Sequence, residues 1–188
     1  VSEVGAVAPT DWIENNFSDG KGDYPVVNIS WYDAANFCQW AGKKLPSEKQ
    51  WEKAARGEIG TEYPWGNEFQ VDYANLSPKA GNKNVIAPVG SYPKGITPLG
   101  VHDMIGNVWE WVKDDYAPYK GSNYQSKYFG DGFKVLRGQS AKDIGHFPRD
   151  TYISALKIFS RNGYRQFANA DQPALDVGFR CASSEMPK

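Results

Sequence analysis

The chain has 188 residues with a formal charge of −1 and a pI near 6.2. It therefore lacks the excess of basic residues that is typical of proteins that bind nucleic acids or anionic membranes. A mean hydropathy of −0.60 and the lack of any long apolar run argue against a membrane-spanning helix. The composition of 19 Gly, 12 Pro, 7 Trp, 11 Tyr and 9 Phe suits one loop-rich domain whose loops are wedged by aromatic rings.

The first regular elements are predicted after a polar, irregular stretch over residues 1–24. The segment PVVNI (25–29) has the pattern of a short buried strand. A helix is then expected from residue 31 up to Gly42, because Ser30 and Asp33 have the spacing of a capping box. Its apolar stripe includes Cys38, which should therefore face the core.

A second helix is predicted directly afterwards, in EKQWEKAAR (48–56). Ser47 and Gln50 form a second capping box, and Gly57 ends the helix. The rest of the chain is rich in Pro, Gly and Asn, which indicates ordered loops. Short strand candidates interrupt these loops, at residues 87–92, 108–112, 133–138 and 177–182. Two helices followed by a loop-dominated region with small antiparallel sheets indicate an α+β fold.

The two cysteines, Cys38 and Cys181, are far apart in the sequence. They cannot supply the four ligands of a structural zinc site by themselves. They form either one long-range disulfide or two free thiols, and the disulfide would point to an oxidising compartment. Closing so long a loop would stabilise the fold by roughly 4 to 5 kcal/mol in the chain-entropy model.

Six motifs now stand in a recognisable order: PVVNISWYDAANFCQWAGKKLPSEKQWEKAARG, YPWGN, APVGSYP, LGVHDMIGNVWEW, VLRG followed by Ser140, and DVGFRCA. This series resembles the formylglycine-generating-enzyme, or sulfatase-modifying-factor, superfamily over about residues 9–182. The resemblance implies an elaborated C-type-lectin-like fold, calcium sites in the loops, and a disulfide between Cys38 and Cys181. Residues 1–188 would then be a single domain that lacks the family's usual N-terminal strand and helix.

Glu110 is unusual because it lies between two tryptophans. In a strand, Trp109 and Trp111 would face one side and Glu110 the other, as a surface carboxylate or as a calcium ligand. Calcium prefers carboxylate and carbonyl oxygens. The resemblance implies that Glu110 is a ligand together with groups of the preceding turn, namely Ile105, Gly106, Val108 and the side chain of Asn107.

A second calcium site is implied at Asn75 and the carbonyl group of Leu76. Its remaining ligands would come from the loop AGNKN (80–84), where Asn82 or Asn84 stands in place of the family's acidic residues. The loss of that carboxylate weakens the expectation.

The family's oxidase members hold copper and the substrate thiol with two cysteines. Counted from Gly138 and Ser140, those positions fall on Asp143 and Pro148 here. A carboxylate and a proline cannot replace thiolate ligands of copper(I). We therefore expect no copper site and no formylglycine generation. The same segment has Gln139 where the family usually has glycine.

Three functions remain open. The favoured one is a non-catalytic binding or assembly module, or accessory subunit, with a contact surface in the aromatic loop 114–133: Tyr116, Tyr119, Tyr124, Tyr128 and Phe129. The alternative is that these rings pack against one another and hold the loops together. The alternatives are an enzyme of the superfamily (formylglycine-generating or another metal-dependent oxidase) and a variable ligand receptor of the retroelement-diversified type. The expected localisation is extracytoplasmic, either periplasmic or secreted.

The last strand carries a further expectation. In lectin-like folds the first and last strands usually pair, so 176–182 should need a neighbour that this chain does not contain. We expect it to contact an upstream fragment of the same precursor or a protein partner, because an uncovered apolar edge promotes association.

Overall fold

The computed structural model describes residues 8–9, 11–77, 86–130 and 132–183. They form an α+β fold, as the sequence predicts. The helices are α1 (Trp31–Trp40), α2 (Glu48–Arg56), α3 (Arg149–Phe159) and the short 3-10 helices Val71–Tyr73 and Pro93–Gly95. The strands are β1 (Trp109–Asp115), β2 (Phe133–Arg137), β3 (Gln166–Asn169) and β4 (Val177–Phe179).

Both predicted capping boxes are confirmed. The Ser30 side chain accepts from the backbone N–H of Asp33, whose carboxylate accepts from the Ser30 N–H, and α1 begins at the next residue. Ser47 and Gln50 do the same at the start of α2. Gly57 follows α2 with a positive φ of 64°. Local hydrogen bonding therefore fixes where these two helices begin.

The strands form one mixed sheet in the order β3-β2-β1-β4. The pairs β1 with β2 and β2 with β3 are antiparallel, whereas β4 runs parallel to β1. The expectation of small, purely antiparallel sheets is therefore wrong. Strand β2, helix α3 and strand β3 lie between β1 and β4 in the chain, and so long an intervening segment allows a parallel pairing.

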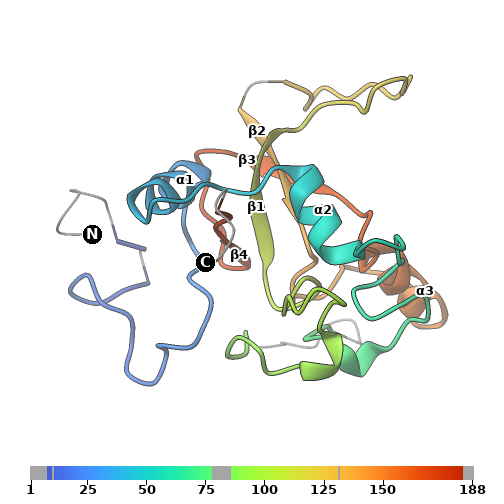
Figure 1. Ribbon diagram of the computed structural model, residues 1–188, viewed down its shortest axis with the longest axis horizontal. Coiled ribbons are helices and arrows are strands. Elements are labelled where there is room, and N and C mark those ends of the chain that lie inside the picture. Colours follow the sequence, from blue (N-terminus) through green and yellow to red (C-terminus); the bar gives the residue numbers. More distant parts are fainter. Residues whose placement is uncertain (1–7, 10, 78–85, 131, 184–188) are drawn as a thin grey trace.

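The sheet separates two apolar clusters (Figure 1). Trp111 points to the side of α1, where it packs with Cys38 and Leu136. Val112 points to the opposite side, with α2 and α3, where it packs with Trp51. This alternation along β1 is the period of two that the sequence pattern predicts.

Two predicted strands do not form. In segment 25–29 the backbone of Asn28 adopts a left-handed φ of 59°, and its N–H donates to the Ala174 carbonyl. In segment 87–92 the backbone of Ala87 pairs with the side chain of Asn107, and Gly90 turns the chain with a φ of 74°. Left-handed residues interrupt the extended geometry that a strand requires.

One α-helix and one strand were not predicted. Helix α3 buries Tyr152 and Leu156, which are four residues apart and lie on one helical face. Strand β3 has only four residues, too few for a clear alternation. The expected count of two helices is therefore too low, since α3 is a third α-helix of 11 residues.

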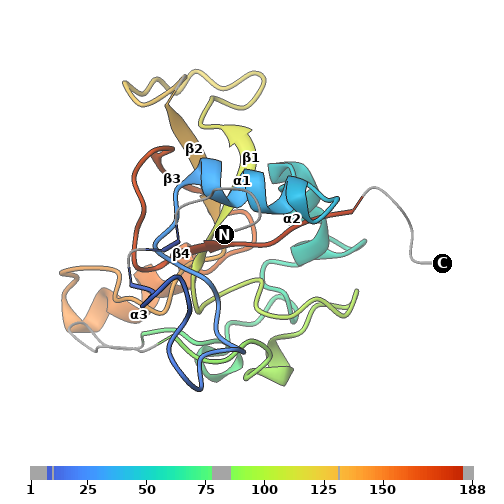
Figure 2. The same ribbon diagram turned by 90° about the vertical axis from the view of Figure 1, so that its left-hand side faces the viewer.

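Strand β4 is at the edge of the sheet and pairs with β1 of the same chain. The expectation that the last strand needs a neighbour from outside this chain is therefore wrong on the side that faces β1. Beyond β4, Ala182 forms an antiparallel bridge with Lys44. Figure 2 shows the 116–130 segment reaching past the ends of β1 and β2, on the side away from α3. No helix within the described ranges is long and apolar enough to cross a membrane.

Candidate functional site

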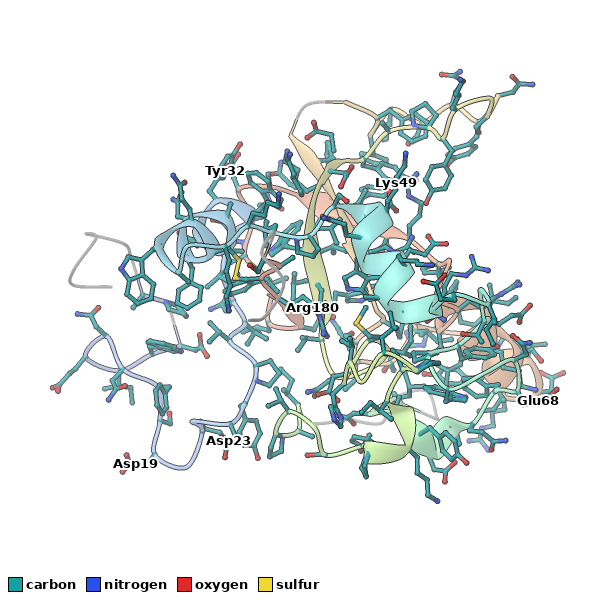
Figure 3. The ribbon with its side chains drawn as sticks, viewed as in Figure 1. Asp19, Asp23, Tyr32, Lys49, Glu68 and Arg180 are labelled. Carbon is teal, nitrogen blue, oxygen red and sulfur yellow. A yellow bond between two sulfur atoms is a disulfide. The ribbon has the colours of Figure 1, made fainter. Side chains whose placement is uncertain are left out.

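Glu110 is buried, with 4% of its surface exposed. It lies on the opposite side of β1 from Trp111, as predicted. Its Oε2 accepts hydrogen bonds from Trp51 Nε1 at 2.7 Å and from Arg180 Nε at 2.6 Å. Its Oε1 accepts from a terminal guanidinium nitrogen of Arg180 at 2.5 Å. We call these three residues the Glu110 cluster, and Figure 3 shows Arg180 at the centre of the molecule.

The guanidinium of Arg180 neutralises Glu110. Burial lowers the pKa of Arg180, but the charge of Glu110 and the hydrogen bonds to it outweigh burial, so the net pKa is raised and Arg180 stays charged. The same guanidinium also donates to the carbonyl groups of His102 and Asp103. The buried charge therefore has a protein partner, and a metal is not needed to explain its position.

The turn before β1 is built for close backbone packing. Gly106 has a φ of 86°, and a Cβ there would lie 2.7 Å from the Asn75 carbonyl oxygen. Asn107 is buried, and its amide pairs with the backbone of Ala87 in both directions while its Oδ1 also accepts from Asn75 Nδ2. The Asn107 side chain thus holds loops together. The two predicted calcium sites are joined here through Asn75 and Asn107.

Calcium stays a prediction at both places. Around Glu110 the donors have the right chemistry, since the turn 105–108 offers carbonyl oxygens next to a carboxylate. Three of the roughly four acceptor positions of that carboxylate are occupied. At the second site Asn75 and Leu76 are buried, whereas Asn82 and Asn84 lie outside the described residues. No group of three or more His, Cys, Asp or Glu that could hold a metal occurs within the described ranges.

A second buried carboxylate, Glu48 in the first turn of α2, was not singled out from the sequence. It pairs with Arg137 at 3.0 Å and with Arg165 at 2.9 Å, and it accepts from the Tyr119 hydroxyl. Arg137 is fully buried and also pairs with Glu52 at 2.6 Å. We call these five residues the Glu48 cluster.

The Glu48 cluster lies beside a cavity of about 770 Å³ between α2 and the segments 114–120 and 163–165. Burial raises the pKa of Tyr119, and the negative charge of Glu48 raises it further, against the opposing effect of Arg165. The Tyr119 hydroxyl therefore stays protonated and donates to Glu48. The cluster connects α2, β2 and the aromatic loop.

The predicted aromatic surface divides into two parts. Tyr116 stacks on Phe167 of β3 with ring centroids 4.2 Å apart, and Tyr128 and Phe129 pack around the same rings. These three side chains hold the loop against the sheet. Tyr119 and Tyr124 remain 53% and 63% exposed, against 36% for Tyr128, so these two offer the most surface to a partner.

Cys38 and Cys181 form a disulfide, with Cα atoms 5.4 Å apart. It joins α1 to the segment after β4. Asp143 and Pro148 stand where the resemblance places the oxidase cysteines. Asp143 lies in the loop before α3, and Pro148 is the residue immediately before that helix. Gln139 adopts a φ of 56°, a conformation that glycine adopts without steric cost.

Sequence reasoning missed the arginines that complete both clusters, Arg137, Arg165 and Arg180. Each is distant in sequence from its carboxylate, by 70 residues for Glu110 and Arg180 and by 89 for Glu48 and Arg137. One local signal was available in the sequence. Arg137 ends an apolar strand and Arg180 follows one, and an unpaired cation at such a place would be costly.

Comparison with known proteins identifies the family. The sequence model of one protein family, the sulfatase-modifying factor enzyme 1-like domain, matches residues 4–185. The mouse protein "Inactive C-alpha-formylglycine-generating enzyme 2" is 37% identical over 174 residues, which cover 87% of this chain and 50% of that protein. The formylglycine-generating enzyme of Streptomyces coelicolor is 33% identical over 181 residues, covering 87% of this chain and 54% of the relative.

A solved structure, that of PvdO from Pseudomonas aeruginosa, superimposes with a TM-score of 0.60 at 29% identity, covering 84% of this chain and 60% of that one. This chain spans about half the length of the two relatives named above. The ordered motifs, the disulfide between α1 and the last segment, and the match over 4–185 agree with one another. The chain belongs to the sulfatase-modifying factor enzyme 1-like domain family.

Proposed function

We propose that this chain is a non-catalytic binding or assembly module on the family's scaffold. The observation that carries the proposal is the disulfide. The sequence has two cysteines, and they are bonded to each other. No thiol is left for the thiolate ligation of copper(I) that an oxidase of this family needs. Similarity to an inactive relative at 37% identity supports the same function.

The partner surface lies where α1 meets β4. Tyr32, Phe37 and Trp40 on the outer face of α1 are 48%, 51% and 56% exposed, and Tyr32 lies at the rim in Figure 3. The ring of Phe37 is 5.6 Å from that of Phe179 on β4, so the aromatic face continues to the edge of the sheet. We call Tyr32, Phe37, Trp40 and Phe179 the α1–β4 surface.

An exposed aromatic face beside a sheet edge suits a protein partner that adds a strand and covers the rings. That partner is either an upstream segment of the same precursor or another subunit. The exposed rings of Tyr119 and Tyr124 form a second, smaller contact area at the far end of the sheet. The disulfide supports an extracytoplasmic location for the assembly.

The test places a photo-crosslinking amino acid at position 40 of the protein, expressed in its own host. We expect a crosslink to a peptide outside residues 1–188, located by mass spectrometry. The matched control is position 59, because Ile59 is 84% exposed but lies after α2, away from the α1–β4 surface. Equal crosslinking at both positions, or at neither, would count against the proposed surface.

Catalysis is tested separately. Copper-loaded protein is incubated with a cysteine-containing sulfatase peptide, and we expect no aldehyde product. Formation of aldehyde above the metal-free blank would support the enzyme alternative. Stoichiometric iron or copper in protein purified from its own host would support it as well.

A further inference from the structure

The cavity of about 770 Å³ beside the Glu48 cluster is lined by charged side chains of both signs. They come from α2 and the turn that follows it, and from the segments 114–120 and 163–165. The volume is within the usual range for a bound ligand. We call it the α2 cavity, and the balance of its charges indicates what it can bind.

The two glutamates of the α2 cavity are neutralised within the chain. Glu48 pairs with Arg137 and Arg165. Glu52 pairs with Arg137 at 2.6 Å and with Arg56 at 2.8 Å. Because each carboxylate has two guanidinium groups at hydrogen-bonding distance, the repulsion between these glutamates and an anionic ligand is largely compensated.

The two aspartates that line the α2 cavity also have partners. Asp115 pairs with Lys134 at 2.5 Å. Asp114 accepts from the backbone N–H of Glu48 at 2.6 Å, at the N-terminus of α2, where the helix dipole is positive. The negative charges of the lining are therefore opposed by groups of the chain itself.

Three lysines of the lining are not compensated in the same way. Lys49 and Lys120 are exposed, and neither has an ion-pair partner in the part of the chain that the structure describes. Lys53 pairs with Glu58 at 2.9 Å, but these side chains are 54% and 80% exposed, and exposed pairs are weak. The α2 cavity therefore offers positive charge, although the whole chain has a formal charge of −1.

The spacing of these lysines suits an extended ligand. Lys49, which Figure 3 labels at the start of α2, and Lys53 are one helical turn apart, so their Cβ atoms are about 6 Å apart on one face of the helix. Alternate side chains of an extended chain lie about 6.6 Å apart on one side. Lys120 adds a third ammonium group from the segment 114–120, next to Tyr119, whose side chain is 53% exposed.

We propose that the α2 cavity binds an extended acidic segment of a protein partner, with glutamate or aspartate at alternate positions. Its carboxylates would pair with Lys49, Lys53 and Lys120. A nucleic acid is disfavoured because four carboxylates line the cavity and would lie against a backbone that is charged at every nucleotide. The inference rests on the proposed binding function and gives the chemistry of the partner at the contact area around Tyr119.

The experiment follows ¹H–¹⁵N correlation spectra of the intact chain during titration with a blocked peptide, Thr-Glu-Thr-Glu-Thr-Glu-Thr, in which the glutamates alternate. We expect saturable shifts at the amides of Lys49, Lys53 and Lys120, and weaker binding as the salt concentration is raised. The peptide with glutamine at the same positions should bind about tenfold more weakly, because three exposed ion pairs are lost. Shifts that do not saturate, or equal binding of the glutamine peptide, would overturn the proposal.

Variants separate the site from the overall charge of the chain. Lys49→Gln should weaken binding about twofold, and the double variant Lys49→Gln, Lys120→Gln about fivefold. The matched control is Lys157→Gln, which makes the same change of charge at an exposed position of α3, outside the lining of the α2 cavity. It should leave binding unchanged. If Lys49→Gln and Lys157→Gln weaken binding equally, the cavity is not the site.

Two further probes identify the kind of partner. The peptide Thr-Thr-Glu-Glu-Glu-Thr-Thr has the same composition with adjacent glutamates, and equal or tighter binding of it would contradict the extended geometry. A single-stranded oligothymidylate of the same charge should bind more weakly than the alternating peptide, and tighter binding would identify a nucleic acid instead. These results are distinct from the crosslink at position 40. If that crosslink forms while the alternating peptide does not bind, the acidic partner is refuted and the proposed function stands.

Discussion

The two buried carboxylates of this chain, Glu48 and Glu110, are 6% and 4% exposed, yet they are neutralised differently. Glu48 pairs with two arginines, one of which, Arg137, is fully buried and shared with Glu52. Within the described residues Glu110 has one ion-pair partner, Arg180, whose side chain is 28% exposed. Solvent can therefore compensate for a broken contact in the Glu110 cluster but not for the loss of Arg137 from the Glu48 cluster.

This difference predicts that Arg137→Met has the largest effect on stability. The change leaves Glu48 and Glu52 without their shared cation, while Arg165 can still reach Glu48. Breaking a buried ion pair from one side costs about 3–5 kcal/mol, and the free energy of unfolding in urea measures it.

The control for that experiment is Arg161→Met. Arg161 pairs with Glu62 at 2.8 Å, but both side chains are about half exposed. Exposed pairs of this kind contribute less than about 1 kcal/mol. Similar losses in the two variants would mean that the burial of Arg137 has no special energetic role.

Removing the disulfide tests whether the Glu48 cluster and the Glu110 cluster open independently of each other. In the double variant Cys38→Ser, Cys181→Ser, the loop between positions 143 residues apart is no longer closed. The free energy of unfolding should therefore fall by about 2–5 kcal/mol. Because the disulfide joins α1 to the segment after β4, amide hydrogen exchange should accelerate in β4 and around Arg180. Exchange in α2 and β2, beside the Glu48 cluster, should change less. A uniform acceleration would show that both clusters open together.

The sequence predicted local structure better than pairing at a distance. Ser30 and Ser47 mark the starts of α1 and α2 because a capping box depends on residues only three positions apart. The alternation around Glu110 placed it correctly opposite Trp111. Its partner could not be predicted, since Arg180 reaches Glu110 through a parallel pairing of β4 with β1. These two strands are separated by β2, α3 and β3, and no local sequence signal marks a pairing over that distance.

Glu110→Gln should have an intermediate effect. Glutamine keeps an acceptor for Trp51 Nε1 but leaves Arg180 without its counter-charge, so we expect a loss of about 1–3 kcal/mol. The loss should be smaller than for Arg137→Met because the side chain of Arg180 is 28% exposed, whereas that of Arg137 is fully buried. Chemical denaturation of both variants under identical conditions makes the comparison.

The same variant tests the proposed calcium site. A ligand that binds only the folded state raises its stability by mass action. We therefore expect millimolar calcium to raise the melting temperature of the unmodified chain relative to a chelator, and to leave that of Glu110→Gln unchanged. An equal response in both would place any calcium elsewhere.

Tyr119→Phe should give the smallest effect, and its dependence on pH identifies the cause. Tyr119 is about half exposed, so losing its hydrogen bond to Glu48 should cost less than about 1 kcal/mol at pH 7. Burial, and then the charge of Glu48, raise the pKa of Tyr119 above its ordinary value of 10.0. Below pH 10 the phenol is protonated in both the folded and the unfolded chain, so its contribution is fully present. Above pH 10 the unfolded chain loses the proton first, and the stability difference between the unmodified chain and Tyr119→Phe should shrink as the pH rises. Other groups titrate in both proteins and cancel in the difference, so a difference that stays constant from pH 8 to pH 11 would contradict a raised pKa at Tyr119.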